Sequence, residues 1–307
     1  MMSKKPEFYF SSIYLAGVMG TILCSQDWTF KLYRNDLCSG TENLNLSDPS
    51  FRTVFIVHGW NQNGSQPCVL EMKDAFLAEG QANVIVVNWA PESFSTLYVS
   101  SAAAVPAVGD EVGNTIFNLY SNGKINITST KMVGFSLGGH VSAVAGQKFE
   151  ELSGKKLEQI VGLEAPGVGF SDKNKGLDEN DAKFVLGYHT SRIGRTRRYG
   201  HVDVYFNADP FHCHPIRQPD CPRNPGVEVP KNTFTPYIFC SHLRSVAYFI
   251  ESIRSGNFIA KECVCGAAEY CFDHVISVGD GMDPSSRGQY YLTTNANSPF
   301  ARGLNGT

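Results

Sequence analysis

The sequence lacks a charge excess of either sign. Lys and Arg total 26 and Asp and Glu total 29, so the formal net charge is −3 and there is no broad basic field for nucleic acid. Internal repeats and low-complexity tracts are also missing, and 42% hydrophobic with only 18% charged residues excludes a disordered chain. Neither a Ca²⁺ loop nor a dinucleotide-binding fingerprint occurs. The sequence therefore predicts a folded globular protein with no cofactor and no nucleic-acid partner.

Long apolar stretches are rare, and one alone has the length to approach a membrane span. It runs from Phe8 to Leu23 behind Lys4 and Lys5, which is the order of a signal peptide. We therefore expect a signal peptide over about residues 1–25, a secreted, extracellular protein, and a single domain over 26–307. The alternatives are an N-terminal membrane anchor or a buried helix, although the stretch is short for a spanning helix.

Nine cysteines are too few for a small disulfide scaffold, but they support an extracellular location. If Cys24 leaves with the signal peptide, the eight that remain are an even number, which suits disulfides in an oxidising space. Sequons for glycosylation fit the same compartment and occur at Asn45, Asn63, Asn126 and Asn305. A metal site through Cys263 and Cys265 is the competing interpretation, but it lacks a second cysteine pair. No metal site is predicted.

Short apolar runs alternate with helix-like stretches through most of the chain. Most runs are apolar on both faces, as are strands of a parallel sheet that is covered on both sides. The predicted strands cover 53–57, 84–87, 131–135, 159–163, 184–186 and 289–293, and the predicted helices cover 69–78, 108–120, 139–152 and 241–253. This alternation predicts one α/β domain with a mostly parallel central sheet. A proline-rich stretch over 207–236 interrupts the pattern, and such long irregular segments are usually functional.

The sharpest motif is Gly-x-Ser-x-Gly, in Gly134-Phe135-Ser136-Leu137-Gly138-Gly139. It lies between a predicted strand and a predicted helix, where the chain must reverse sharply and the serine hydroxyl projects from the edge of the sheet. This context predicts that Ser136 is a catalytic nucleophile. The alternative is a glycine-rich turn without chemistry.

A second strand, over 53–57, ends in His58-Gly59-Trp60. In this kind of fold a loop in that position supplies one backbone donor to an oxyanion hole, and the residue after the nucleophile supplies the other. We therefore predict the amides of Trp60 and Leu137 as the two donors. His58 is predicted to be structural, holding backbone groups of its turn.

The acid and the base are expected downstream of the nucleophile, in that order. Glu164 is the candidate acid, because it follows the predicted strand 159–163 and precedes a Pro-Gly turn. His242 is the candidate base, because it follows Cys240 and stands where a loop is expected to enter a late helix. Asp203 is the alternative acid, expected after the next strand. Either carboxylate would orient the imidazole and stabilise its charged form.

Taken in order, these motifs resemble those of the animal lipase family, which includes pancreatic lipase, lipoprotein lipase and the insect-venom phospholipases A1. The resemblance extends from about Thr53 to the end of the chain. The matching pieces are His58-Gly59-Trp60, Gly134-Phe135-Ser136-Leu137-Gly138-Gly139-His140, Gly162-Leu163-Glu164-Ala165-Pro166, Tyr188-His189-Thr190, Gly200-His201-Val202-Asp203, Cys240-Ser241-His242-Leu243-Arg244-Ser245 and Gly288-Gln289-Tyr290-Tyr291-Leu292.

The resemblance implies an α/β-hydrolase fold with helices on both faces of the sheet, and a Ser136–Glu164–His242 triad. It also implies a lid closed by a disulfide between Cys221 and Cys240, with eighteen residues between them. In the family, a long lid goes with triacylglycerol specificity and a very short one with phospholipase A1, so this length is intermediate. The lid residues expected to face lipid are Val227, Val229, Phe234, Tyr237, Ile238 and Phe239.

Of the several departures from the family pattern, two bear most on the prediction. Position 164 is normally Asp, and the extra methylene of Glu164 moves the carboxylate. The sequence also ends without the C-terminal β-sandwich of the pancreatic and lipoprotein enzymes, so its size is closest to that of the arthropod phospholipases A1.

The resulting prediction is a secreted serine carboxylic-ester hydrolase that acts on glycerolipids at a lipid–water interface. Phospholipase A1 and triacylglycerol lipase activities are both open, and peripheral contact with a membrane or lipid surface is compatible with either. The alternative is a catalytically weak or inactive lipid-binding or yolk-type protein on the same fold. The sequence leaves the oligomeric state open.

Overall fold

The computed structural model describes residues 29–36, 39–44, 46, 48–170, 176–208, 214–221, 236–264 and 271–307. The expected signal peptide, the Asn45 sequon, four of the cysteines and the expected lid positions Val227, Val229 and Phe234 lie outside these residues, as do the side chains of 236–238. Within the described ranges, no helix combines the length and the apolar character needed to cross a bilayer.

Ten strands form one sheet in the order β1-β3-β2-β4-β5-β6-β7-β10-β8-β9. Every pairing from β3 to β10 is parallel, whereas β1, β8 and β9 pair antiparallel at the two ends. The strands are β1 (Thr29–Tyr33), β2 (Arg52–Val57), β3 (Ala82–Asn88), β4 (Thr130–Phe135), β5 (Gln159–Leu163), β6 (Phe184–His189), β7 (Val202–Phe206), β8 (Ile259–Cys263), β9 (Cys271–Ser277) and β10 (Gly288–Leu292).

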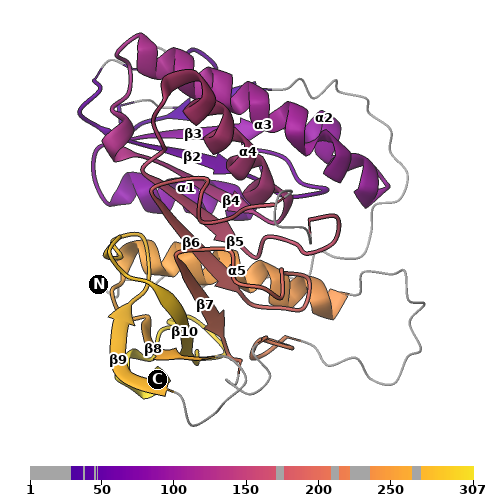
Figure 1. The fold of residues 1–307 in the computed structure, drawn as a ribbon, viewed down its shortest axis with the longest axis vertical. Helices are drawn as coiled ribbons and strands as arrows, with labels where there is room; N and C mark the ends of the chain where they lie inside the picture. The colour runs from indigo at the N-terminus through magenta and orange to yellow at the C-terminus, as the bar shows by residue number, and fades with distance from the viewer. Residues whose placement is uncertain are drawn as a thin grey trace, which may run out of the picture.

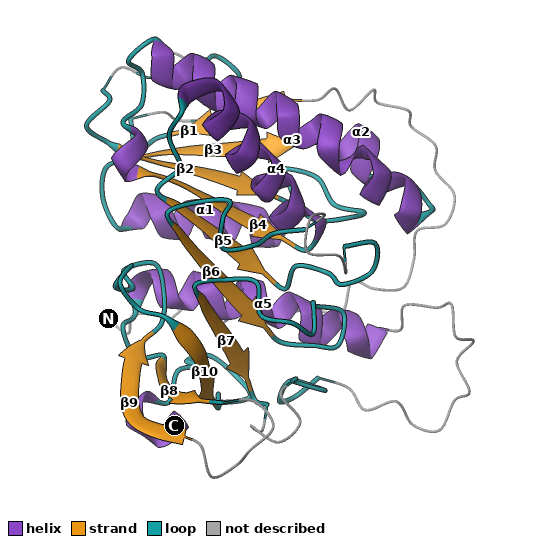
Figure 2. Cartoon of the chain, in the orientation of Figure 1, coloured by secondary structure: helices purple, strands orange, loops and turns teal. Residues whose placement is uncertain are grey.

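Helices cover both faces of this sheet. Figure 1 shows α3 and α4 side by side across one face, with α1 and α5 behind the strands on the other. Figure 2 shows the strands as one twisted sheet between the two helical layers. The helices are α1 (Pro67–Ala78), α2 (Ala90–Ser93), α3 (Tyr98–Ser121), α4 (Leu137–Ser153) and α5 (Pro236–Arg254), and there are two short 3₁₀ turns, η1 (Ile127–Ser129) and η2 (Gly303–Gly306).

Two apolar cores explain this arrangement. The central strands alternate their side chains between the two faces, and both sets are buried because each face meets helices. Val69 of α1 and Phe249 of α5 belong to one core, and Val112 of α3 and Val141 of α4 belong to the other. The predicted fold class is therefore confirmed, and the mostly parallel sheet with helices on both faces is the arrangement of the α/β-hydrolase fold.

All six predicted strands and all four predicted helices are present, with shifted ends. Strands β1, β7, β8 and β9 were not expected from the apolar runs. The side chains of β9 are mostly exposed, and β7 contains a buried charge at Asp203, so neither segment has a continuous apolar pattern.

The register of the parallel strands places the candidate residues at one edge. Phe135, Leu163 and Tyr188 are paired in a row across β4, β5 and β6. The residues that follow them, Ser136 and Glu164 among them, therefore leave the sheet together at its carboxyl edge. Ligand sites of open α/β sheets lie at this edge.

Candidate active site

Ser136 occupies the tight turn between β4 and α4 and is 7% exposed. Its backbone has φ 54° and ψ −126°, a conformation that costs a non-glycine residue about 1–3 kcal/mol. A Cβ on Gly134 would lie 2.2 Å from the carbonyl oxygen of Gly138, and one on Gly138 would lie 2.2 Å from that of Val57. Glycines at both positions let β4, α4 and β2 approach this closely. The strand–turn–helix context predicted for the motif is confirmed.

The loop after β2 touches this elbow directly. A Cβ on Gly59 would lie 2.8 Å from the Cβ of Ser136. Trp60 follows Gly59, and its indole packs edge-on against Tyr98 with ring centroids 5.6 Å apart. Leu137 is the first residue of α4, where backbone amides point out of the helix toward the elbow. These positions support the two predicted oxyanion donors, whose role stays a prediction.

His58 is structural, as predicted. Its Nε2 accepts a hydrogen bond from the amide of Trp89 at 3.1 Å, and its Nδ1 lies 3.0 Å from the carbonyl oxygen of Gly59. Burial lowers the pKa of His58 to about 4, so the ring is neutral at neutral pH. The neutral ring fixes the turn that presents Gly59 and Trp60.

His242 lies inside α5, not on a loop at its entrance, which corrects the expectation. The helix begins at Pro236, six positions before His242. The imidazole packs against Phe135, with ring centroids 4.6 Å apart, so it lies beside the residue that precedes Ser136. Burial lowers the pKa of His242 to about 3. Its Nδ1 is one of the buried polar atoms without a hydrogen-bond partner in the described part of the chain.

Glu164 directly follows β5 and is fully buried. Its φ is 55°, and such a positive φ, which Ser136 also has, is rare outside glycine and occurs often at functional sites. The amide and hydroxyl of Thr190 donate to its Oε2, and the amide of Gly194 donates to its Oε1 at 2.8 Å. Burial raises the pKa of Glu164 to about 7, against the opposing effect of these donors and of nearby His189.

Asp203 does not follow a strand, which corrects a second expectation. It is the second residue of β7 and lies in register with Gly187 of β6. His189 donates from Nε2 to its Oδ1 at 2.8 Å, and the amides of Tyr199 and Gly200 donate to its two oxygens at 3.2 and 3.0 Å. This set of donors closes the turn between β6 and β7, and the role of Asp203 as the alternative acid stays a prediction.

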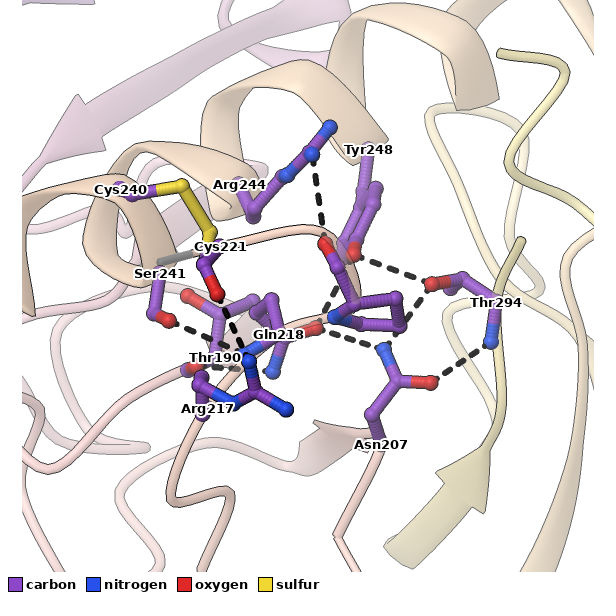
Figure 3. Close-up of a disulfide and its surroundings, with 11 residues drawn as sticks. Thr190, Asn207, Arg217, Gln218, Cys221, Cys240, Ser241, Arg244, Tyr248 and Thr294 are labelled. Carbon is purple, nitrogen blue, oxygen red and sulfur yellow. Dashed lines mark hydrogen bonds between the residues drawn. A yellow bond between two sulfur atoms is a disulfide. The ribbon is translucent and has the colours of Figure 1, made fainter. Parts of the chain in front are cut away.

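The disulfide between Cys221 and Cys240, implied by the family resemblance, is present in the structure. Figure 3 shows how Gln218 anchors the segment that leads to it. The amide of Gln218 donates to the hydroxyl of Ser241 at 3.0 Å, and its Nε2 donates to the carbonyl oxygens of Thr190 and Phe206, each at 2.8 Å. Gln218 therefore links the neighbour of His242 to the residue that holds Glu164.

A second disulfide joins Cys263 of β8 to Cys271 of β9 across a hairpin. Cys263 is therefore not available as a metal ligand, which removes the alternative interpretation of that segment. Cys68 has a free thiol, and burial raises its pKa to about 11, which keeps the thiol protonated at neutral pH.

Three of these residues were not singled out as functional from the sequence. Thr190 and Gln218 appeared only as parts of stretches that resemble the lipase family, Gln218 in the Gln218-Pro219-Asp220-Cys221 stretch before the lid, and Gly194 carried no signal of its own. Their importance comes from partners 26 to 30 positions away along the chain, for example the contact between Gly194 and Glu164.

Comparisons with known proteins identify the family of this chain. The family model described as Lipase matches residues 36–300. Lipase member H-A of Xenopus laevis is 33% identical over 75% of this chain and 46% of its own length. Phospholipase A1 VesT1.02 of Vespa tropica is 28% identical over 76% of each chain. Inactive pancreatic lipase-related protein 1 of Mus musculus is 30% identical over 76% of this chain and 52% of its own. The chain thus spans about half the length of the vertebrate relatives it matches.

Proposed function

The chain belongs to the lipase family, and on that premise we propose that it hydrolyses carboxylic esters of glycerolipids, with Ser136 as nucleophile, His242 as base and Glu164 as acid. The observation that carries the proposal is the backbone of Ser136. Ser136 has φ 54° at the carboxyl edge of a parallel sheet, where it contacts Gly59 and lies beside the imidazole of His242 that packs on Phe135. Strained backbone of this kind occurs mainly at functional sites, which supports a catalytic role for Ser136.

The proposed reaction is acyl transfer in two steps. Ser136 Oγ attacks the acyl carbonyl carbon while the imidazole of His242 takes its proton and then passes it to the departing glycerol oxygen. The amides of Trp60 and Leu137 stabilise the oxyanion of each tetrahedral intermediate. Water then attacks the acyl-enzyme with His242 again as base, which releases a fatty acid and restores Ser136.

Glu164 acts on His242 in this proposal through its Oε1. A carboxylate oxygen has two lone pairs. Oε2 already accepts two hydrogen bonds from Thr190, whereas Oε1 accepts one from Gly194. Oε1 therefore retains one acceptor position, and the unpartnered Nδ1 of His242 needs one acceptor. A bond between these two atoms would set the tautomer of the imidazole and stabilise its charged form.

The proposed substrates are phospholipids, cleaved as by a phospholipase A1, and triacylglycerols. The name of the wasp relative supports the first, and its length is the nearer to that of this chain. The disulfides fit a secreted protein, because such bonds persist in oxidising compartments. A secreted enzyme of this kind would reach its substrate by peripheral contact with a lipid surface.

A second candidate function is lipid binding without turnover. The observation that favours it is the unpartnered Nδ1 of His242, which leaves the base without an orienting acid in this conformation. The mouse relative carries the word inactive in its name, so loss of activity has a precedent among the matches.

Fatty-acid release from phosphatidylcholine and from triolein tests the proposal. The secreted chain would be compared with Ser136→Ala, Glu164→Gln and the exposed serine variant Ser100→Ala as control. If Ser100→Ala is the one variant that retains turnover, the triad is supported, and the preferred lipid identifies the activity. If Glu164→Gln retains turnover as well, Glu164 takes no part in the reaction. Vesicle binding without any turnover by the folded wild type supports the second candidate instead.

A further inference from the structure

One loop holds the whole carboxylate of Glu164. Thr190 supplies an amide and a hydroxyl to Oε2, and Gly194 supplies an amide to Oε1. This loop is itself pinned to the residues that follow Glu164. Pro166 and Gly194 form an antiparallel bridge, and the amide of Arg195 donates to the carbonyl oxygen of Ala165 at 2.9 Å. The donors therefore keep a fixed distance from the backbone that carries the carboxylate.

The carboxylate of Glu164 fills the space that a side chain at position 194 would occupy. A Cβ built on Gly194 would lie 2.0 Å from Oε1 of Glu164, 3.0 Å from its Cδ and 3.7 Å from its Cγ, and its three nearest neighbours all belong to Glu164. Gly194 is absent from the glycines with positive φ, so its backbone accepts an alanine. An alanine there would therefore displace the carboxylate of Glu164 and would not strain the backbone.

We propose that Thr190 and Gly194 are positioning residues of the ester hydrolase, forming a pocket sized for glutamate that aims the free acceptor position of Oε1 at His242. The inference rests on the proposed function. The side chain of Glu164 needs the volume that Gly194 leaves open. Residues 164 and 194 therefore form a matched pair.

A double-substitution cycle tests the match. The chains compared are the wild type, Gly194→Ala, Glu164→Asp and the double variant, with kcat/KM and Tm measured for each. Gly194→Ala keeps its amide donor but displaces the flexible end of Glu164, so kcat/KM falls about 10- to 100-fold. In the Glu164→Asp background the carboxylate is one methylene shorter, and the same alanine lowers kcat/KM by less than about three-fold.

Gly167→Ala is the matched control. Gly167 lies on the neighbouring segment, and the nearest atom to a Cβ there is the Cα of Arg195 at 3.5 Å, an ordinary contact. Its kcat/KM should change by less than about two-fold.

Thr190 gives a second, independent measurement. Thr190→Val removes the hydroxyl and keeps the amide, whereas Thr190→Ser keeps both donors. Losing a donor to the charged carboxylate raises the pKa of Glu164, so the acid limb of the pH–rate profile of Thr190→Val moves to higher pH. Thr190→Ser restores the wild-type profile. The other titratable groups that face Glu164 are His189 and Tyr199, which are intact in both variants.

The outcomes separate the two proposals. Wild-type turnover that Ser136→Ala abolishes establishes the ester hydrolase. With that result in hand, equal losses from Gly194→Ala in both backgrounds, or coupling in Tm with kcat/KM unchanged, overturn the positioning role alone. A wild type without turnover overturns the proposed function, and the positioning role with it.

Discussion

The ring of Phe135 lies 4.6 Å from the imidazole of His242, centroid to centroid. Phe135 belongs to β4 and directly precedes the strained Ser136, whereas His242 comes from α5. One side chain therefore fixes the distance between the turn that carries the proposed nucleophile and the helix that carries the proposed base. Local sequence creates the first element, and packing across the sheet places the second.

Phe135→Leu tests this contact. Leucine keeps the position apolar but is smaller and lacks the flat face against which the imidazole rests, so His242 gains freedom to rotate. We expect kcat/KM to fall about ten-fold or more. Steady-state kinetics on a short-chain ester measure the loss. Phe272→Leu, at a 48% exposed position of β9, is the control, and equal activity in the two variants would contradict the role of Phe135.

The pH dependence of turnover should report Glu164. Its raised pKa, about 7, means that the carboxyl gains a proton as the pH falls through neutrality, and a neutral acid no longer stabilises the imidazolium. His242, with a pKa lowered to about 3, stays neutral over the same range. Activity should therefore be highest above pH 7 and fall below it.

A profile of kcat/KM against pH, run for the wild type and for Glu164→Gln, measures this limb. The amide variant should be weaker and should lack the limb near neutrality. A limb that persists in Glu164→Gln would assign the titration to another group.

Gln218→Leu should destabilise the fold and weaken activity together. The substitution leaves two carbonyl oxygens, of Thr190 and Phe206, without their donor, and removes the acceptor of Asn207 Nδ2 and Tyr248 OH. Leaving buried polar groups unsatisfied costs about 1–3 kcal/mol each, less what rearrangement recovers. Urea unfolding measures the loss. Gln147→Leu, which removes one partly buried bond to Asp181, is the milder control. An unchanged midpoint for Gln218→Leu would show that the network shown in Figure 3 adds no stability.

Asp280, which lies between β9 and β10, should stabilise the fold through ion pairs with residues at the amino ends of β2 and β4. Its carboxylate accepts from Arg52 and from Lys131, each at 2.7 Å, and its side chain is only 9% exposed. Asp280→Asn removes one charge from a partly buried triad, at an expected cost of about 1.5–3 kcal/mol. Asp36→Asn, at a 66% exposed pair with Arg34, should change stability by less than about 0.5 kcal/mol. Thermal unfolding of both variants gives the comparison, and equal shifts would contradict the special weight of Asp280.

Most of the sheet and the elbow were predictable because their signals are local. Gly134 to Gly139 encode a sharp reversal whatever surrounds them, and the apolar runs of β2 to β6 need no partner to be recognised. The place of His242 within α5 was harder to predict from the sequence. The helix begins at Pro236, which belongs to the proline-rich stretch 207–236 that interrupts the apolar pattern, although proline is favoured at the first position of a helix.

Strand β7 and the glutamate pocket were hidden for a different reason. Asp203 inside β7 looks like a residue beyond a strand until His189, Tyr199 and Gly200 are seen to satisfy its carboxylate. Likewise, Gly194 looks like an ordinary loop glycine until Glu164 occupies the volume beside it. Contacts made through tertiary structure decide both cases, and no short pattern contains them.

The disulfide between Cys221 and Cys240 closes a ring whose two ends are 19 positions apart along the chain and 5.6 Å apart in space. Doubling the length of a closed loop changes its closure free energy by only about 0.6 kcal/mol. Insertions and deletions between Cys221 and Pro236, where α5 begins, should therefore change the stability of the fold little. In the proposed enzyme, we therefore expect this segment to tolerate changes of length without displacing Ser136, Glu164 or His242.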